Sequence, residues 1–187
     1  MGLVLEAFFC LKWKGGGHVL EKPPPCNKRG LGKAPTNKTL IFFVAAKIKE
    51  IFTLGRQYPW PRPEMCPRCH ERAVWGHGFV LAYFDGFDQG VLLRRYRCPG
   101  CGCVIRVRPE GYFSRFQASI ATIRFSLSHR LRRGRWPPHL SRSRQGHWLR
   151  ALRRKSAAYL GQRWSQGLMV AFDWLFSRGI IPVSRSI

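Results

Sequence analysis

The chain has 187 residues and a one-sided charge, with 33 Lys and Arg against 9 Asp and Glu and a formal net charge of +24. Such a charge repels itself unless a polyanion compensates it, which favours nucleic acid as the partner, with an anionic membrane surface as the alternative. Residues 115–187 hold 15 basic groups, 14 of them Arg, and 1 acidic group. The competing explanation is a GC-rich coding sequence, which raises arginine content without selection for binding.

Residues 1–51 differ from the rest of the chain. They contain GGGH and PPPCNKRGLGK and no sustained apolar period, so they are predicted to be a disordered leader with room for one short helix at Thr39–Phe52. The competing interpretation is a start codon further downstream, in which case part of this leader is not made. TLIFFVAA at residues 39–46 is far shorter than the ~20 residues of a membrane-spanning helix. The chain is predicted to be soluble and cytoplasmic, without a membrane partner.

Residues 52–113 show the short apolar runs and turn residues of a small β-domain. A proline-rich lead-in, YPWPRPE from Tyr58, is predicted to be extended. AVWGHGFVLAYFDG and VLLRRYRC lie on either side of a glycine-bounded turn at residues 86–90, which predicts a β-hairpin. CVIRVRPEG is predicted to be a third strand, with Ile105 and Val107 on one face. The expected sheet is antiparallel.

Residues 114–187 change to the period of an α-helix. Five apolar residues at spacings of three or four form one stripe that ends at Leu131, before Gly134 and two prolines. Two further helices are predicted at residues 147–160 and 163–177, with a turn at Gly161. These two helices could form a helix-turn-helix, and a plain three-helix bundle with a solvated arginine face is the equal alternative.

Two Cys-x-x-Cys steps, CPRC and CPGC, predict a metal site. The predicted ligands are Cys66, Cys69, Cys98 and Cys101. Four thiolates at this spacing suit a tetrahedral Zn²⁺, which would have no open position and would be structural, stabilising strands too few to fold alone. Iron uses the same sulfur pattern. Cys103 could replace Cys101, but it is expected to open a strand with its side chain turned away.

No group of residues points to catalysis. The region after Phe113 contains one carboxylate, Asp173, and cannot supply the acidic cluster that holds Mg²⁺ in phosphoryl transfer. Asp85 and Asp88 flank the hairpin turn and are predicted to be turn residues. Nucleotide-binding, hydrolase and zinc-protease motifs are absent from the sequence. The protein is predicted not to be an enzyme and to take no small-molecule substrate.

Arginines of the C-terminal helices are the predicted nucleic-acid contacts, because the planar guanidinium suits phosphate groups. They are Arg124, Arg130, Arg132, Arg133, Arg150, Arg153 and Arg154. DNA and RNA are not distinguished by this pattern. The alternative is a protein-interaction adaptor that docks on a partner through exposed aromatic side chains, namely Trp60, Trp75, Tyr83 and Phe84.

CPRCHERAVWGHGFVLAYFDG and RRYRCPGCGCVIRVRPEGYFSRF, followed by a basic helical region, resemble the zinc ribbon that opens many bacterial insertion-sequence transposases and occurs in short stand-alone proteins. The likeness covers about residues 64–133. In that family a helix-turn-helix and a catalytic domain follow the ribbon, and the front part is thought to bind transposon ends. The missing catalytic domain implies a DNA-binding module without the chemistry, or a mobile-element remnant without a function.

The predicted fold class is α+β, with a small antiparallel zinc-ribbon β-domain, a basic three-helix segment and a disordered leader. The expected domain boundaries are residues 1–51 for the leader, 52–113 for the zinc ribbon and 114–187 for the basic helical segment.

Overall fold

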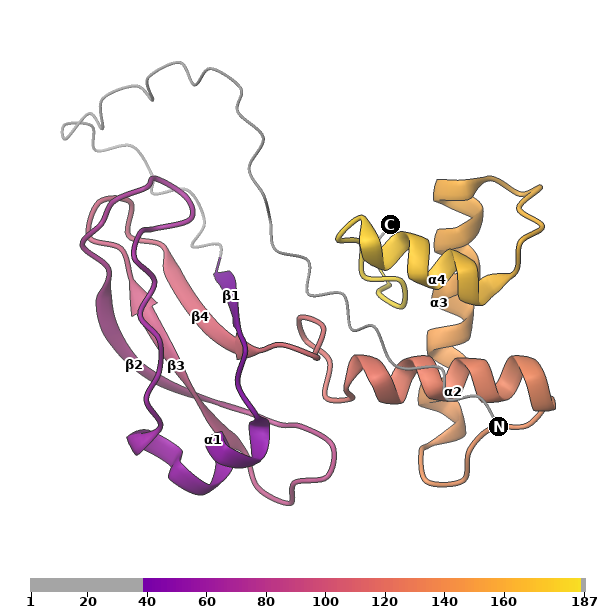
Figure 1. The fold of residues 1–187 in the computed structure, drawn as a ribbon, viewed down its shortest axis with the longest axis horizontal. Helices are drawn as coiled ribbons and strands as arrows, with labels where there is room; N and C mark the ends of the chain where they lie inside the picture. The colour runs from indigo at the N-terminus through magenta and orange to yellow at the C-terminus, as the bar shows by residue number, and fades with distance from the viewer. Residues whose placement is uncertain (1–38, 186–187) are drawn as a thin grey trace, which may run out of the picture. The chain divides into compact units, whose positions relative to one another are not determined.

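The computed structural model describes residues 39–185, and all structural statements refer to them. The described residues all belong to one compact unit. They form a four-stranded mixed sheet and four α-helices (Figure 1). The predicted α+β class is confirmed at this level. The part of the predicted leader before residue 39 lies outside the described residues.

The sheet has the strand order β1-β4-β3-β2. β2 (Trp75–Ala82) and β3 (Val91–Arg97) form the predicted antiparallel hairpin, and β4 (Val104–Pro109) pairs antiparallel with β3. Ile105 and Val107 are fully buried, as alternation along a strand with one inner face requires. The hairpin and the third strand were therefore correctly predicted.

A further strand and a short helix lie where a disordered leader was predicted. β1 (Leu40–Val44) pairs parallel with β4, and α1 (Ile48–Leu54) follows and buries Ile51 completely. The predictions of disorder at the position of β1 and of a purely antiparallel sheet are therefore wrong, whereas α1 overlaps the range Thr39–Phe52 in which one short helix was predicted. TLIFFVAA is a short apolar run without a period, and such a run becomes a strand only where another strand offers hydrogen bonds, as β4 does here.

Two apolar clusters pack against the strands. The first contains Val44, Cys66, Val74, Tyr96, Cys98, Cys103, Ile105 and Val107. The second contains Ile51, Ala82, Phe84, Val91 and Leu93. Trp60 of the proline-rich lead-in packs against both, and the Tyr96 hydroxyl donates to the Pro61 carbonyl at 3.2 Å. Two of the four predicted metal ligands, Cys66 and Cys98, are therefore part of the core, whereas Cys101 is partly buried and Cys69 is exposed.

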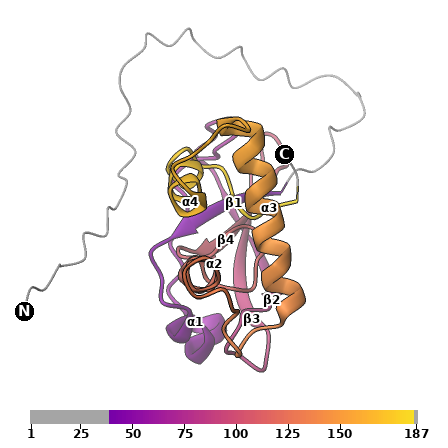
Figure 2. The same ribbon diagram turned by 90° about the vertical axis from the view of Figure 1, so that its right-hand side faces the viewer.

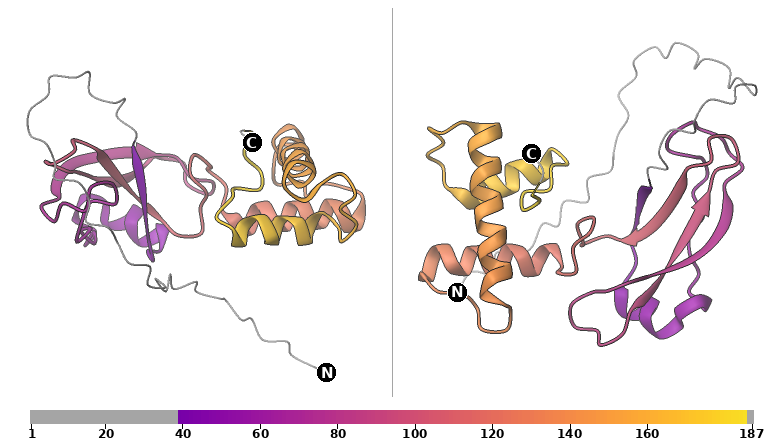
Figure 3. Two further views of the ribbon diagram at one scale, coloured as in Figure 1. Left: turned by 90° about the horizontal axis from the view of Figure 1, so that it is seen from above. Right: turned by 180° about the vertical axis from the view of Figure 1, so that it is seen from behind.

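The other three helices are α2 (Ile120–Arg133), α3 (Arg142–Leu160) and α4 (Leu168–Ser177). Figure 2 shows α2 and α4 nearly end-on and α3 side-on, so α3 crosses the other two. In the view from above in Figure 3, α4 lies over α2 and the two helices run in nearly the same direction. Their shared core includes Leu127, Trp148 and Phe172. None of the described helices is both long and apolar enough to cross a bilayer.

A buried polar side chain fixes the connection between α2 and α3. Gln145 is fully buried, and its Nε2 donates to the carbonyls of Pro137 at 3.0 Å and Leu140 at 2.7 Å. Its Oε1 accepts from the Ser126 hydroxyl at 2.5 Å. These three hydrogen bonds join α3 to Ser126 of α2 and to the connecting loop at residues 134–141. The α2–α3 corner is therefore a defined structure.

The connection between α3 and α4 does not favour the predicted helix-turn-helix. It comprises residues 161–167, since α3 ends at Leu160 and α4 begins at Leu168. A helix-turn-helix uses a turn of about three or four residues. The helices of this segment pack around one core, and the helix-turn-helix stays an unsupported prediction.

Candidate metal centre

Four cysteines from two turns meet in the structure. The Sγ atoms of Cys66, Cys69, Cys98 and Cys101 all lie within 4.8 Å of one another. The Cys69–Cys98 pair of sulfurs is separated by 3.5 Å and the Cys66–Cys101 pair by 3.7 Å. Sulfurs placed tetrahedrally around an ion at ~2.3 Å would lie about 3.8 Å apart. The cluster therefore fits a tetrahedral metal ion, and it consists of the four residues predicted from sequence.

The two turns have matching backbone hydrogen bonds. The His70 N–H donates to the Cys66 carbonyl, and the Gly102 N–H donates to the Cys98 carbonyl, both at 2.9 Å. In each turn the first cysteine donates its own N–H to the carbonyl five residues later, at 2.8 Å and 3.0 Å. Both closing residues have positive φ, 58° for His70 and 68° for Gly102. The same turn, built twice, thus supplies two sulfurs from each side.

Replacing the closing residue should lower stability in the second turn but not in the first. Gly102→Ala is expected to lower the free energy of unfolding by about 1 kcal/mol, because an L-residue is strained at this φ. A Cβ at this position would meet no atom within 4 Å, so the loss isolates backbone strain. His70→Gly relieves the same strain but adds chain entropy to the unfolded state, so a change between zero and a gain of about 1 kcal/mol is expected.

Urea denaturation of the full chain with one equivalent of Zn²⁺ measures both changes. A loss of equal size for His70→Gly and Gly102→Ala would contradict the equivalence of the two turns.

Cys103 lies nearer to the cluster than predicted. Its side chain is 1% exposed, and its Sγ is 3.4 Å from that of Cys66. The expectation that it turns away is wrong because Cys103, which directly precedes β4, continues the alternation of that strand and packs in the same cluster as Ile105 and Val107. Its sulfur is nevertheless outside the set in which all sulfurs are mutually close. His70, the closing residue of the first turn, is exposed.

Burial and crowding separate the pKa values of these thiols. Burial raises the pKa of Cys69 to about 12, and it also raises the pKa values of Cys98 and Cys103. For Cys66, burial raises the pKa, but hydrogen bonds from the N–H groups of Cys69 and Arg68 and from two neighbouring thiols lower it. Together these hydrogen bonds outweigh burial, and the pKa falls to about 6. Without a cation, one thiolate therefore opposes ionisation of the others. A bound divalent cation would stabilise all four thiolates together.

The seven arginines predicted to bind nucleic acid fall into two groups. Arg124 donates two hydrogen bonds to Asp173, at 3.0 Å and 2.8 Å, and is committed to an ion pair. Arg130 lies over the Trp136 ring at 5.3 Å and donates to the Gly134 carbonyl. The remaining five are exposed: Arg132, Arg133, Arg150, Arg153 and Arg154.

One stripe of α3 concentrates positive charge. His147, Arg150 and Arg154 follow one another at helical spacings of three and four, and Arg185 donates from Nε to His147 Nε2 at 3.2 Å. Burial lowers the pKa of His147, and the charges of Arg185, Arg150 and Arg154 lower it further. None of the ion pairs found within residues 39–185 involves these arginines. We refer to Arg150, Arg153 and Arg154 as the α3 arginines.

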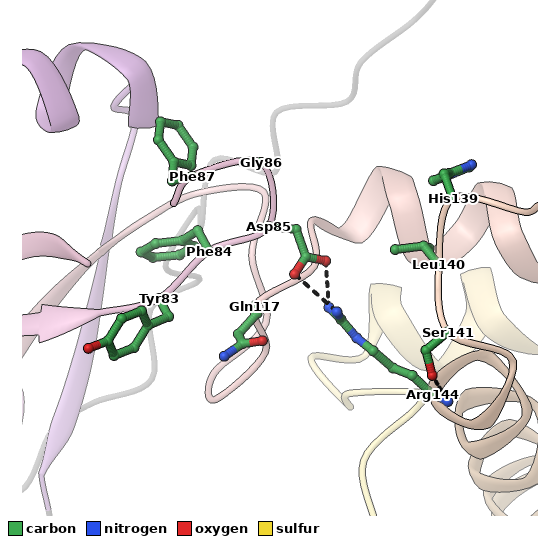
Figure 4. Close-up of a pocket in the computed structure, with 10 residues that line it drawn as sticks. All are labelled: Tyr83, Phe84, Asp85, Gly86, Phe87, Gln117, His139, Leu140, Ser141 and Arg144. Atoms are coloured by element: carbon green, nitrogen blue, oxygen red, sulfur yellow. Dashed lines mark hydrogen bonds and ion pairs between the residues drawn. The ribbon is translucent and has the colours of Figure 1, made fainter. Parts of the chain in front are cut away.

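An open cavity of about 480 Å³ contains the ion pair of Asp85 with Arg144 (Figure 4). The guanidinium donates to both carboxylate oxygens, at 3.0 Å and 2.5 Å, and lies over the Trp148 ring at 5.2 Å. The two charges satisfy each other, so this pair links the turn after β2 to α3. The partners are 59 positions apart, and no sequence pattern signals their contact.

The four aromatic residues of the adaptor hypothesis do not form one exposed surface. Trp75 and Tyr83 are each 59% exposed, but Phe84 is 3% exposed and belongs to the second apolar cluster. Trp60 packs against both clusters. Two of the four are therefore engaged inside the fold, which the apolar composition of the sequence could not reveal.

Comparisons with known proteins do not identify the chain. It matches no family model, no curated protein and no solved structure. The resemblance to transposase zinc ribbons therefore depends on the quoted sequence segments alone and stays a prediction.

Proposed function

We propose that this is a nucleic-acid-binding protein whose β-domain is a zinc ribbon, with DNA as the first partner to test. The all-sulfur donor set supports zinc, because soft thiolates at tetrahedral spacing suit this ion. Cys66, Cys69, Cys98 and Cys101 would hold it. With four protein ligands the ion would offer no open position, and its contribution would be to stabilise the strands.

The observation that carries nucleic-acid binding is the row of α3 arginines. These side chains are exposed, form no ion pair with a described carboxylate and share their helix with His147, whose pKa is lowered by burial and also by the charges of Arg185, Arg150 and Arg154. Guanidinium groups free of acidic partners are available to phosphate oxygens. Arg132 and Arg133 at the end of α2 add two more exposed charges.

Binding measurements on the full chain test this function. The purified protein is assayed for metal by mass spectrometry, and labelled duplex DNA, single-stranded DNA and RNA are then titrated at two salt concentrations. We expect one zinc per chain and an affinity that falls steeply with salt, as phosphate contacts require. Iron in place of zinc would contradict the metal assignment. Absence of binding at low salt by the zinc-loaded chain would contradict the function.

A further inference from the structure

One face of the sheet carries a group of arginines where β3 and β4 pair, beyond the buried Val91 and Leu93 of the same face of β3. In β4, Arg106 and Arg108 alternate with the buried Ile105 and therefore lie on the opposite face. Arg95 of β3 is the direct cross-strand partner of Arg106, so it shares that face, and Arg97 follows two positions later. We refer to Arg95, Arg97, Arg106 and Arg108 as the arginine face.

Close packing of these cations needs a compensating anion. Directly opposed like charges destabilise a sheet, and Arg95 faces Arg106 in this way. Burial lowers the pKa of Arg108, and the charge of Arg106 lowers it further. None of the ion pairs of residues 39–185 reaches this face. The fold therefore keeps a repulsive arrangement that a polyanion would relieve.

The guanidinium groups also have unused donors. The Nε atoms of Arg95, Arg106 and Arg108 are buried and have no hydrogen-bond acceptor among the described residues. A buried donor without an acceptor costs free energy. For Arg108, which is 5% exposed, the other end of the group does donate, to the Phe116 carbonyl. Because these Nε atoms are buried and the Arg108 guanidinium lies over the Phe84 ring at 4.9 Å, an anion would reach this face through the partly exposed Arg95 and Arg106 and the exposed Arg97.

Aromatic side chains border the arginine face on both sides. Phe43 of β1 pairs with Arg108, and Trp75 of β2 pairs with Arg97, so each ring lies on the same side of the sheet as its partner. The two rings are 44% and 59% exposed. They are three strand spacings apart across the sheet and four residues apart along β4, where Trp75 aligns with Val104 and Phe43 with Arg108, which corresponds to on the order of 20 Å. The surface thus has cations in the middle and exposed rings at the margins.

We infer that the arginine face, with Trp75 and Phe43, binds single-stranded nucleic acid, with phosphates against the arginines and unstacked bases against the rings. This inference rests on the proposed function and adds a partner class and a second surface to it. Bases of a duplex are stacked on one another, whereas each base of a single strand offers a free π-face to an aromatic ring. A second copy of the chain fits poorly, because it would present the same positive charge.

The test compares variants of this face with matched controls in the zinc-loaded full chain. Arg95→Gln and Arg106→Gln each remove one charge of the opposed pair, and Trp75→Ala removes a marginal ring. Arg178→Gln, on an exposed arginine after α4, is the charge control. Tyr159→Ala, on a 44% exposed ring of α3, is the aromatic control. Anisotropy titrations use a labelled single-stranded DNA and its duplex across a salt series.

We expect each arginine variant to weaken single-strand binding about fivefold and to reduce the salt slope by about 0.7. Trp75→Ala should weaken it about tenfold. Thermal melting provides the control for folding: Arg106→Gln should leave the melting temperature unchanged or raise it, because it removes a repulsion. The two control variants should leave single-strand binding within about twofold of wild type.

Each contrary result has a distinct meaning. Unchanged single-strand affinity in all three variants, with duplex binding intact, would overturn this inference and leave the proposed function standing. Equal losses for single strand and duplex would overturn the choice of a single strand. Dimerisation of the wild type that Trp75→Ala abolishes would assign the face to a second copy and overturn the inference. Absence of all nucleic-acid binding would overturn both proposals.

Discussion

Cys101→Ala should remove the bound zinc and unfold the sheet, whereas Cys103→Ala should leave one zinc per chain. Cys101 belongs to the mutually close set of four sulfurs, and Cys103 does not. Structural zinc contributes about 10–16 kcal/mol to the folding of zinc-finger peptides, and a whole domain is stable by only about 5–15 kcal/mol. Loss of one ligand can therefore unfold the strands. Metal analysis and circular dichroism measure the two outcomes.

The paired substitution also decides between the two neighbouring thiols. Cys103 is buried, so its replacement by alanine should cost about 1 kcal/mol in packing without loss of metal. If Cys103→Ala loses zinc while Cys101→Ala retains it, the ligand set is Cys66, Cys69, Cys98 and Cys103 instead. Retention of zinc by both single variants would show that Cys101 and Cys103 can each serve as the fourth ligand when the other is absent.

Replacing the α3 arginines together should have the largest effect on duplex binding. Arg150→Gln, Arg153→Gln and Arg154→Gln, combined in one chain, are expected to make the salt slope less steep by about 2.7 and to weaken affinity on the order of a hundredfold near 0.1 M salt. The reason is that three exposed cations without acidic partners are lost. Anisotropy titration of a labelled duplex across a salt series measures both quantities.

Arg124→Gln is the matched control for this experiment. It also removes a positive charge, but Asp173 already compensates that charge in an exposed ion pair. The slope should therefore stay within the error of the wild-type value, and stability should fall by less than about 1 kcal/mol. Equal losses of affinity for Arg124→Gln and for the triple variant would show that net charge matters and that the α3 arginines have no special role.

Local patterns allowed the hairpin, the third strand and the four-cysteine cluster to be predicted. Gly86 and Gly90 bound the turn, and alternation along β4 correctly placed Ile105 and Val107 on one face, which the structure shows to be buried. The Cys-x-x-Cys spacing fixes two sulfurs in each turn, so only the meeting of the two turns depended on the fold. In these cases residues close in sequence contain the information.

The features that were missed depend on pairings distant in sequence. β1 is a strand because β4 accepts it in parallel, with Leu40 opposite Ile105, and the run itself has no period to show this. Asp85 meets Arg144, and Arg95 meets Arg106, through the fold alone. Such contacts become visible only once strand order and register are known. For the same reason the sequence suggested helical arginines as contacts and gave no sign of the arginine face.

The salt dependence of duplex binding by the zinc-loaded, wild-type full chain tests the account most directly. The five exposed helical arginines, Arg132, Arg133 and the α3 arginines, predict a plot of log affinity against log salt with a slope of roughly −4.5 if each contacts one phosphate. A steep negative slope of this order is the expected result. A flat plot, or no binding at the lowest salt concentration, would contradict the claim that this chain uses a metal-stabilised fold to present arginines to nucleic acid.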